Sequence, residues 1–171
     1  MIPEKIRSLI LPAILLLFVL STSCKPETDE EPRTREKEWE ELNAWMQNLE
    51  AGGENIDTTD LMVFYIVRKP GNGAYPVAGD TCAVSYMGYV AKGSKFEDSK
   101  DIYKEGIWKF IYKPPHDVRG FIDGIGYMNE GAEVEMYIHS DFAYGAKGAD
   151  GIPPFTTLMY KVTMQEMNPK K

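Results

Sequence analysis

The chain has 171 residues, of which 43% are apolar and 26% are charged. That length leaves room for one domain with a proper core and one short additional element. The formal net charge of −7 argues against nucleic acid and against an anionic lipid surface as binding partners. The two cysteines, Cys24 and Cys82, lie in unrelated contexts and form no disulfide framework, and we expect Cys82 to be a small core residue.

Residues 1–23 are predicted to be a secretory signal. A weakly basic start precedes an apolar run from Leu9 to Leu20, about a dozen residues and too short to span a bilayer as a helix. Small residues and then Cys24 follow, and this arrangement resembles the signal of bacterial lipoproteins, in the looser form of the Bacteroidetes group. The resemblance implies that Cys24 is lipidated and anchors an outer-membrane lipoprotein of the cell envelope, facing the periplasm or the cell surface. An ordinary cleavage site with a free Cys24 is the alternative.

Residues 24–33 are predicted to be a disordered acidic tether. The segment after Cys24 contains no apolar residue able to pack in a core, so ordering it would gain nothing. Its acidic run also resembles the surface-export signal of Bacteroidetes lipoproteins, while a solvated spacer is the simpler interpretation.

Residues 34–60 are predicted to form an amphipathic helix and a linker. Thr34 is a fair N-cap, and a glycine pair after Ala51 ends the pattern. Apolar residues recur at the spacing of one helix face: Trp39, Leu42, Met46 and Leu49. We expect this face to pack on the domain that follows, in a monomer; a dimer through residues 34–50 is the alternative.

Residues 61–171 are predicted to form one domain in which many strands accompany one short helix. Runs of β-branched, aromatic and alternating residues predict strands at 61–67, 81–89, 108–112, 134–139 and 157–167. Apolar residues at helical spacing predict a short helix at 120–128. The pattern indicates an α+β domain in which a helix packs across a sheet.

Several motifs in this domain occur in the order of a known family. They are Val84-Ser-Tyr-Met-Gly88, Gly93-Ser-Lys-Phe-Glu-Asp-Ser99, Asp141-Phe-Ala-Tyr-Gly145, Ile152-Pro-Pro and Thr157-Leu-Met-Tyr160. Together, from about Met62 to Met167, they resemble the FKBP family of peptidyl-prolyl cis/trans isomerases. The resemblance implies an antiparallel sheet of about five strands wrapped around one short helix. It also implies that the protein accelerates rotation about X-Pro bonds of proline-containing polypeptides, with no cofactor and no metal.

The resemblance also implies a set of site residues. The catalytic group comprises Tyr86, Phe96, Glu97, Asp98 and Tyr144. The substrate-binding group comprises Trp108, Val118, Phe121, Ile152 and Tyr160. Taken singly, each of these residues is better explained by core packing, whereas their joint agreement with one pocket favours a binding site.

The implied chemistry needs no nucleophile. An apolar pocket removes the solvation of the planar X-Pro amide and so favours its twisted form, and a hydrogen bond aligned only with the twisted form adds to this.

Two positions depart from the family pattern: Glu97 replaces the usual Asp, a role that Asp98 could take, and Phe121 replaces a Trp. Asp117 stands where the family often has an apolar rim residue. Glu97 and Phe121 favour one alternative, a low-activity FKBP-like chaperone or binding module. A scaffold in a surface complex is a further alternative, which exposed apolar surface on the helix from Trp39 to Leu49 would support. His116 and His139 are predicted to be ordinary polar residues.

Overall fold

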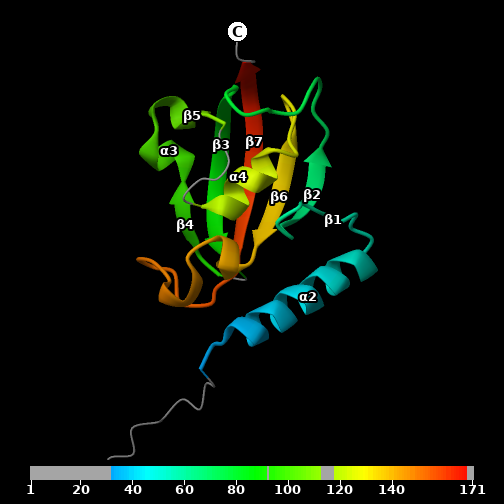
Figure 1. Ribbon diagram of the computed structural model, residues 1–171, viewed down its shortest axis with the longest axis vertical. Coiled ribbons are helices and arrows are strands. Elements are labelled where there is room, and N and C mark those ends of the chain that lie inside the picture. The colour runs from blue at the N-terminus through cyan, green and yellow to red at the C-terminus, as the bar shows by residue number, and fades with distance from the viewer. Residues whose placement is uncertain (1–31, 92, 113–117, 169–171) are drawn as a thin grey trace, which may run out of the picture. The chain divides into compact units, whose positions relative to one another are not determined.

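The computed structural model describes residues 32–91, 93–112 and 118–168 (Figure 1). The predicted signal, Cys24 and nearly all of the predicted tether lie outside the described residues, as do His116 and Asp117. The described residues from Arg33 onward belong to one compact unit.

Seven strands among the described residues form a single antiparallel sheet. In chain order they are β1 (Asp57–Thr58), β2 (Phe64–Lys69), β3 (Thr81–Val90), β4 (Lys95–Asp98), β5 (Trp108–Ile111), β6 (Glu133–Ile138) and β7 (Leu158–Asn168). Their order across the sheet is β1-β2-β6-β7-β3-β4, and β5 pairs with the first part of β3. The last strand therefore lies in the middle, paired with β6 on one side and with the whole length of β3 on the other.

Helix α4 (Arg119–Ile125) crosses one face of this sheet (Figure 1). Its side chains Ile122 and Ile125 are fully buried with Met136 and Ile138 of β6, and this cluster is the main core of the domain. The core also contains Cys82, as expected, and burial raises the pKa of its thiol to about 11. A sheet with one short helix packed across it confirms the predicted fold class.

The structure differs from the predicted elements at one strand boundary and in several short elements. Strand β2 begins at Phe64 rather than at residue 61, because Met62 turns the chain with a φ of 61°. Strands β1 and β4 were not predicted, since β1 has two residues and three of the four residues of β4 are charged. After β4 come α3 (Ser99–Ile102) and the 3-10 turn η1 (Lys104–Gly106), and after β6 come η2 (Ser140–Phe142) and η3 (Gly145–Lys147).

Helix α2 (Arg35–Ala51) packs on the opposite face of the sheet from α4. Its N-cap is Thr34, whose hydroxyl accepts a hydrogen bond from the N–H of Lys37 at 3.2 Å. Leu42 and Met46 are buried against Ile66 and Tyr137, so the expectation that the helix packs on its own domain is confirmed.

The end of β6 at Tyr137 and Ile138, together with His139 after it, is buried on both faces of the sheet because α2 covers this end. His139 is completely buried, an environment that the residues around it in the sequence did not indicate. Among the residues that the structure describes, no helix has both the length and the apolar character needed to cross a bilayer.

Candidate active site

A cavity of about 240 Å³ lies between α4, the sheet and the segment after η2. Its lining is mostly aromatic: Tyr86, Glu97, Tyr103, Trp108, Val118, Phe121, Ile122, Tyr144 and Tyr160. Strands β3, β4, β5 and β7 and helix α4 each contribute at least one of these side chains. Residues far apart in the sequence therefore share one small apolar chamber, with a volume near the lower end of the range for ligand pockets.

Phe121 forms the floor of the cavity and is only 4% exposed. The rings of Tyr86 and Tyr160 meet it edge-on, with centroid distances of 5.3 Å and 4.8 Å, and Trp108 is tilted against it at 6.1 Å. Such edge-to-face contacts hold each ring in one orientation. The chamber is therefore formed before any ligand enters it.

Glu97 is the one carboxylate in the lining. Its Oε1 accepts a hydrogen bond from the Tyr86 hydroxyl at 2.7 Å, and its Oε2 accepts a longer one from the Tyr160 hydroxyl at 3.5 Å. Burial raises the pKa of both tyrosines, and the negative charge of Glu97 raises it further, so both hydroxyls keep their protons at neutral pH. Glu97 thus orients two wall tyrosines.

Tyr144 follows η2, on an irregular segment that borders the cavity. Burial raises the pKa of its hydroxyl, and the nearby Glu97 raises it further. The hydroxyl makes no hydrogen bond with another described residue, so its proton can be donated to a ligand in the cavity.

The structure brings most of the predicted site residues together around this cavity. Those that line it are Tyr86, Glu97, Trp108, Val118, Phe121, Tyr144 and Tyr160. Phe96 does not line it but lies behind the wall, edge-on to Tyr160 at 5.8 Å. Ile152 is 5% exposed and belongs to the core that supports the wall.

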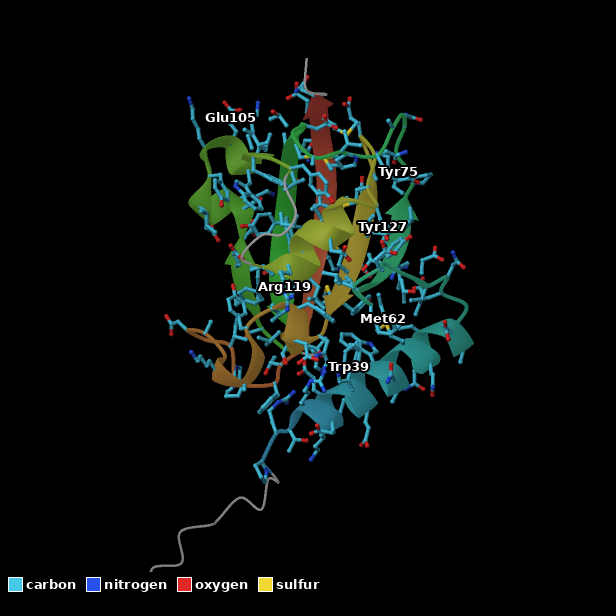
Figure 2. The ribbon with its side chains drawn as sticks, in the orientation of Figure 1. Trp39, Met62, Tyr75, Glu105, Arg119 and Tyr127 are labelled. Carbon is cyan, nitrogen blue, oxygen red and sulfur yellow. The ribbon has the colours of Figure 1, made fainter. Side chains whose placement is uncertain are left out.

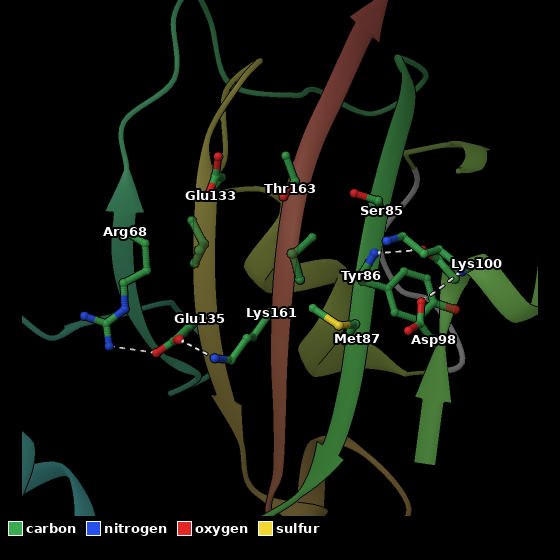
Figure 3. A pocket seen from close by; sticks show the side chains of 13 residues that line it. Arg68, Ser85, Tyr86, Met87, Asp98, Lys100, Glu133, Glu135, Lys161 and Thr163 are labelled. Atoms are coloured by element: carbon green, nitrogen blue, oxygen red, sulfur yellow. Dashed lines mark hydrogen bonds and ion pairs between the residues drawn. The ribbon is translucent and has the colours of Figure 1, made fainter. Parts of the chain in front are cut away.

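Asp98 lies outside the cavity, which corrects its assignment to the site. Neighbouring residues of a strand point to opposite faces, so when Glu97 faces the cavity Asp98 cannot. Its carboxylate instead pairs with the Lys95 ammonium at 2.7 Å. It also accepts a hydrogen bond from the Lys100 N–H at 3.0 Å, which caps α3 (Figure 3).

Two lining residues were not predicted, Tyr103 and Ile122. Tyr103 lies between α3 and η1 and stacks on Trp108 with a centroid distance of 6.1 Å. It belongs to a segment without regular periodicity, so no pattern pointed to it. Ile122 directly follows the predicted Phe121 and contributes both to the core and to the lining.

A second hollow, of about 300 Å³, lies on the outer face of the sheet (Figure 3). Three of its charged side chains are paired with one another: Glu135 contacts Arg68 at 2.7 Å and Lys161 at 3.2 Å. These contacts lower the pKa of Glu135 despite its partial burial. A proline ring needs an apolar wall, so the aromatic cavity is the better candidate active site.

The sequence comparisons agree with this geometry. The family model described as FKBP-type peptidyl-prolyl cis-trans isomerase matches residues 73–165. The chain therefore belongs to this family and is a peptidyl-prolyl cis/trans isomerase of the FKBP type. Among the described residues, no group of three or more His, Cys, Asp or Glu side chains could hold a metal ion.

Individual relatives show how far the similarity extends. The chain is 38% identical over 91 residues to peptidyl-prolyl cis-trans isomerase FKBP1A of Xenopus laevis, an alignment that covers 53% of this chain and 82% of the relative. It is 28% identical over 116 residues to FkpA of Escherichia coli, covering 68% of this chain and 42% of FkpA, so the chain matches less than half the length of that relative. The crystal structure of a peptidyl-prolyl cis-trans isomerase from Pseudomonas syringae shares the fold, with a TM-score of 0.63 and 24% identity, over 81% of this chain and 99% of that one.

Proposed function

We propose that the aromatic cavity binds the proline of an X-Pro segment in exported polypeptides and stabilises the twisted form of the preceding amide. The barrier to this rotation is about 18–20 kcal/mol, because the planar amide is stabilised by resonance. The charge-separated resonance form is well solvated by water, and a dry aromatic chamber withholds that solvation. The observation that carries the proposal is the preformed chamber of Phe121, Tyr86, Trp108 and Tyr160, with the Tyr144 hydroxyl at its edge.

Two hydrogen-bond donors are assigned to the substrate. The Tyr144 hydroxyl donates to the oxygen of the amide that rotates. The backbone N–H of Val118 donates to the carbonyl on the C-terminal side of the proline. Val118 is the N-cap of α4, where its carbonyl accepts from the N–H groups of Phe121 and Ile122 while its own N–H takes no part in the helix. Both donors are available without breaking a helix bond.

The partners and the location of the protein follow from the residues before the domain. The proposed lipid anchor at Cys24 would hold the isomerase at the outer membrane, and proline-containing exported polypeptides would be its clients. Helix α2 uses its apolar stripe on its own sheet, which supports a monomer. A Cys24→Ser variant that stayed in the membrane fraction would overturn the anchor, and protease shaving of intact cells distinguishes the periplasm from the cell surface.

The proposal is tested by the cis/trans isomerisation rate of a short X-Pro peptide. Tyr144→Phe removes only the hydroxyl, and losing one hydrogen bond to the substrate lowers kcat/KM by about three- to tenfold. Tyr75→Phe is the matched control, because Tyr75 is 59% exposed and lies outside the cavity lining (Figure 2). Equal rates for both variants and the unchanged chain would remove Tyr144 from the mechanism.

A binding or chaperone module with little turnover is the second candidate. It is favoured by Glu97, whose two oxygens are both engaged by wall tyrosines, and by Phe121, which has a smaller ring than the Trp of the family pattern. This candidate predicts that the folded chain suppresses aggregation of an unfolded, proline-containing protein without accelerating peptide isomerisation. Clear acceleration of peptide isomerisation by the unchanged chain, reduced in Tyr144→Phe to the same degree as the suppression of aggregation, would contradict a separate holding function.

A further inference from the structure

Helix α2 carries a buried carboxylate that the proposed mechanism does not use. Glu38 is only 2% exposed, although the helix itself lies at the surface of the domain. A glutamate is rarely buried to this degree unless its charge is fully hydrogen-bonded, because the loss of hydration is otherwise too costly. The partners of Glu38 therefore indicate what the burial achieves.

The carboxylate of Glu38 accepts hydrogen bonds from two residues that are far from it in the sequence. Its Oε1 accepts from the N–H of Ser140 at 2.9 Å and from the hydroxyl of Thr157 at 2.9 Å, and its Oε2 accepts a short bond from the hydroxyl of Ser140. Ser140 and Thr157 lie near the two ends of residues 139–157, which we call the Tyr144 segment. One side chain of α2 thus joins both ends of the segment that carries Tyr144.

Other residues at the start of α2 reinforce this connection. The Arg35 guanidinium binds the carboxylate of Asp141 at 2.8 Å and 2.6 Å, and the Arg33 guanidinium donates to the carbonyl of Phe155 at 2.8 Å and 3.0 Å. The indole of Trp39 stacks on the His139 ring, with centroids 3.9 Å apart and planes 9° from parallel. The contacts of α2 are again made near the ends of the Tyr144 segment.

Between these ends the Tyr144 segment contains no strand of the sheet. It passes through η2 and η3 and takes positive φ angles at Gly145, Gly148, Gly151 and Phe155. Its internal backbone bonds are local, such as the pair between Ala149 and Ile152 and the bond from Phe155 N–H to the Gly145 carbonyl. Ile152 holds the later part of the segment in the core, so the placement of Tyr144, only four residues after Ser140, depends on how the first end is held.

We propose that Glu38 is a positioning residue of the isomerase, which acts through the Tyr144 segment and sets the position of the Tyr144 hydroxyl. The inference rests on the proposed donation by Tyr144 and extends the active-site architecture to α2, which lies outside the residues that the family model matches. The helix is then a part of the catalytic unit as well as a cover for the sheet.

Glu38→Gln is the most conservative variant that tests this role. The Nδ1 atom of His139 accepts from the N–H of Asp141 at 3.1 Å, so in the neutral ring Nε2 carries the proton. Nε2 lies 3.2 Å from Glu38 Oε2, without the alignment of a hydrogen bond. If the glutamine oxygen keeps the N–H of Ser140, its amide N–H₂ points at the N–H of His139, and two donors then oppose each other.

The experiment is a double-mutant cycle with Tyr144→Phe in the full-length chain, measured as kcat/KM on an X-Pro peptide. If Glu38 acts through the Tyr144 hydroxyl, Glu38→Gln lowers kcat/KM by about three- to tenfold in the unchanged background, as the loss of that hydrogen bond would. In the Tyr144→Phe background the same change then has less than about a twofold effect, because residues that act as a unit are not additive. Glu40→Gln, the same chemical change on an exposed residue of α2, leaves both backgrounds unaffected.

Every other outcome overturns the inference. An equal loss in both backgrounds would show that Glu38 supports the fold in general, and no loss in the unchanged background would show that the connection does not matter for activity. A Tyr144→Phe variant with full activity would refute the proposed donation by Tyr144, and with it the role of Glu38. This result comes from the single variant and is therefore distinguishable from the effect of Glu38→Gln. If Glu38→Gln does not fold, Arg35→Gln replaces it under the same criteria, since the Arg35 side chain is 56% exposed.

Discussion

Gly120, the second residue of α4, packs closely against β6. A Cβ added there would lie 2.4 Å from Cγ2 of Ile138 and 3.1 Å from Cβ of Phe142. Alanine is favoured over glycine in a helix by about 1 kcal/mol, whereas extra volume in a packed core costs about 1–3 kcal/mol. Ile138 is fully buried, and an approach of 2.4 Å lies at the upper end of the overpacking range, about 3 kcal/mol, so we expect Gly120→Ala to lower the free energy of unfolding by about 2 kcal/mol in net terms.

The assay is urea or thermal unfolding, combined with the isomerisation rate. For a domain of this size the loss corresponds to a melting midpoint lower by about 4–8 °C. Because Phe121 is the next residue, the cavity floor shifts with the helix, and kcat/KM falls as well. Gly52→Ala is the control, since its added Cβ would lie 3.2 Å from the Leu49 carbonyl as its nearest neighbour. A Gly120→Ala protein at least as stable as the unchanged chain would refute the packing argument.

Three further predictions concern α2 and the core. Leu42→Ala removes a side chain that is 1% exposed, and we expect urea unfolding to show a free energy lower by about 2–4 kcal/mol; a change below about 0.5 kcal/mol would mean that α2 is not part of the cooperative unit. The hydrogen bond from Arg35 lowers the pKa of Asp141 from 3.8, so this pair stabilises the fold above that pH and its contribution is lost as the pH falls through the lowered value. The difference in unfolding free energy between the unchanged chain and Arg35→Gln should therefore shrink from about pH 6 to about pH 2, and a constant difference would contradict this. Because burial raises the pKa of Cys82 to about 11, iodoacetamide should leave the native Cys24→Ser variant unlabelled at neutral pH and label it in urea; full labelling of the native form would show that the thiol is accessible.

Local patterns were sufficient for the elements that have strong periodicity. The apolar spacing of α2, its Thr34 cap and the alternation of β3 and β7 follow from neighbouring residues, and the structure agrees with them. Strand β4 has no such pattern, so the sequence did not reveal that Glu97 and Asp98 point to opposite faces. The resemblance to the family predicted which residues line the cavity, because a family pattern reflects contacts between distant residues. Local periodicity carries no information about such contacts.

The environment of His139 depends on residues that are distant in the sequence. Glu38 and Trp39 precede it by about a hundred positions, and only the packing of α2 on the end of β6 brings the three side chains together. Burial lowers the pKa of His139, against the opposing effect of Glu38 and Asp141. No pattern around His139 itself indicates this burial, because the residues that cause it belong to a helix outside the family motif.

The central position of β7 has a consequence for the order in which the domain folds. Residues 158–168 are the last strand along the chain, yet they join the β1-β2-β6 half of the sheet to the half formed by β3, β4 and β5. During synthesis from the N-terminus, the strands of both halves are made before the strand that joins them. Pairing β7 with β3 closes a long loop, and such closure is slow relative to local folding. The fold can therefore be completed only when residues 158–168 are available, and until then two unpaired strand edges remain accessible to chaperones and proteases.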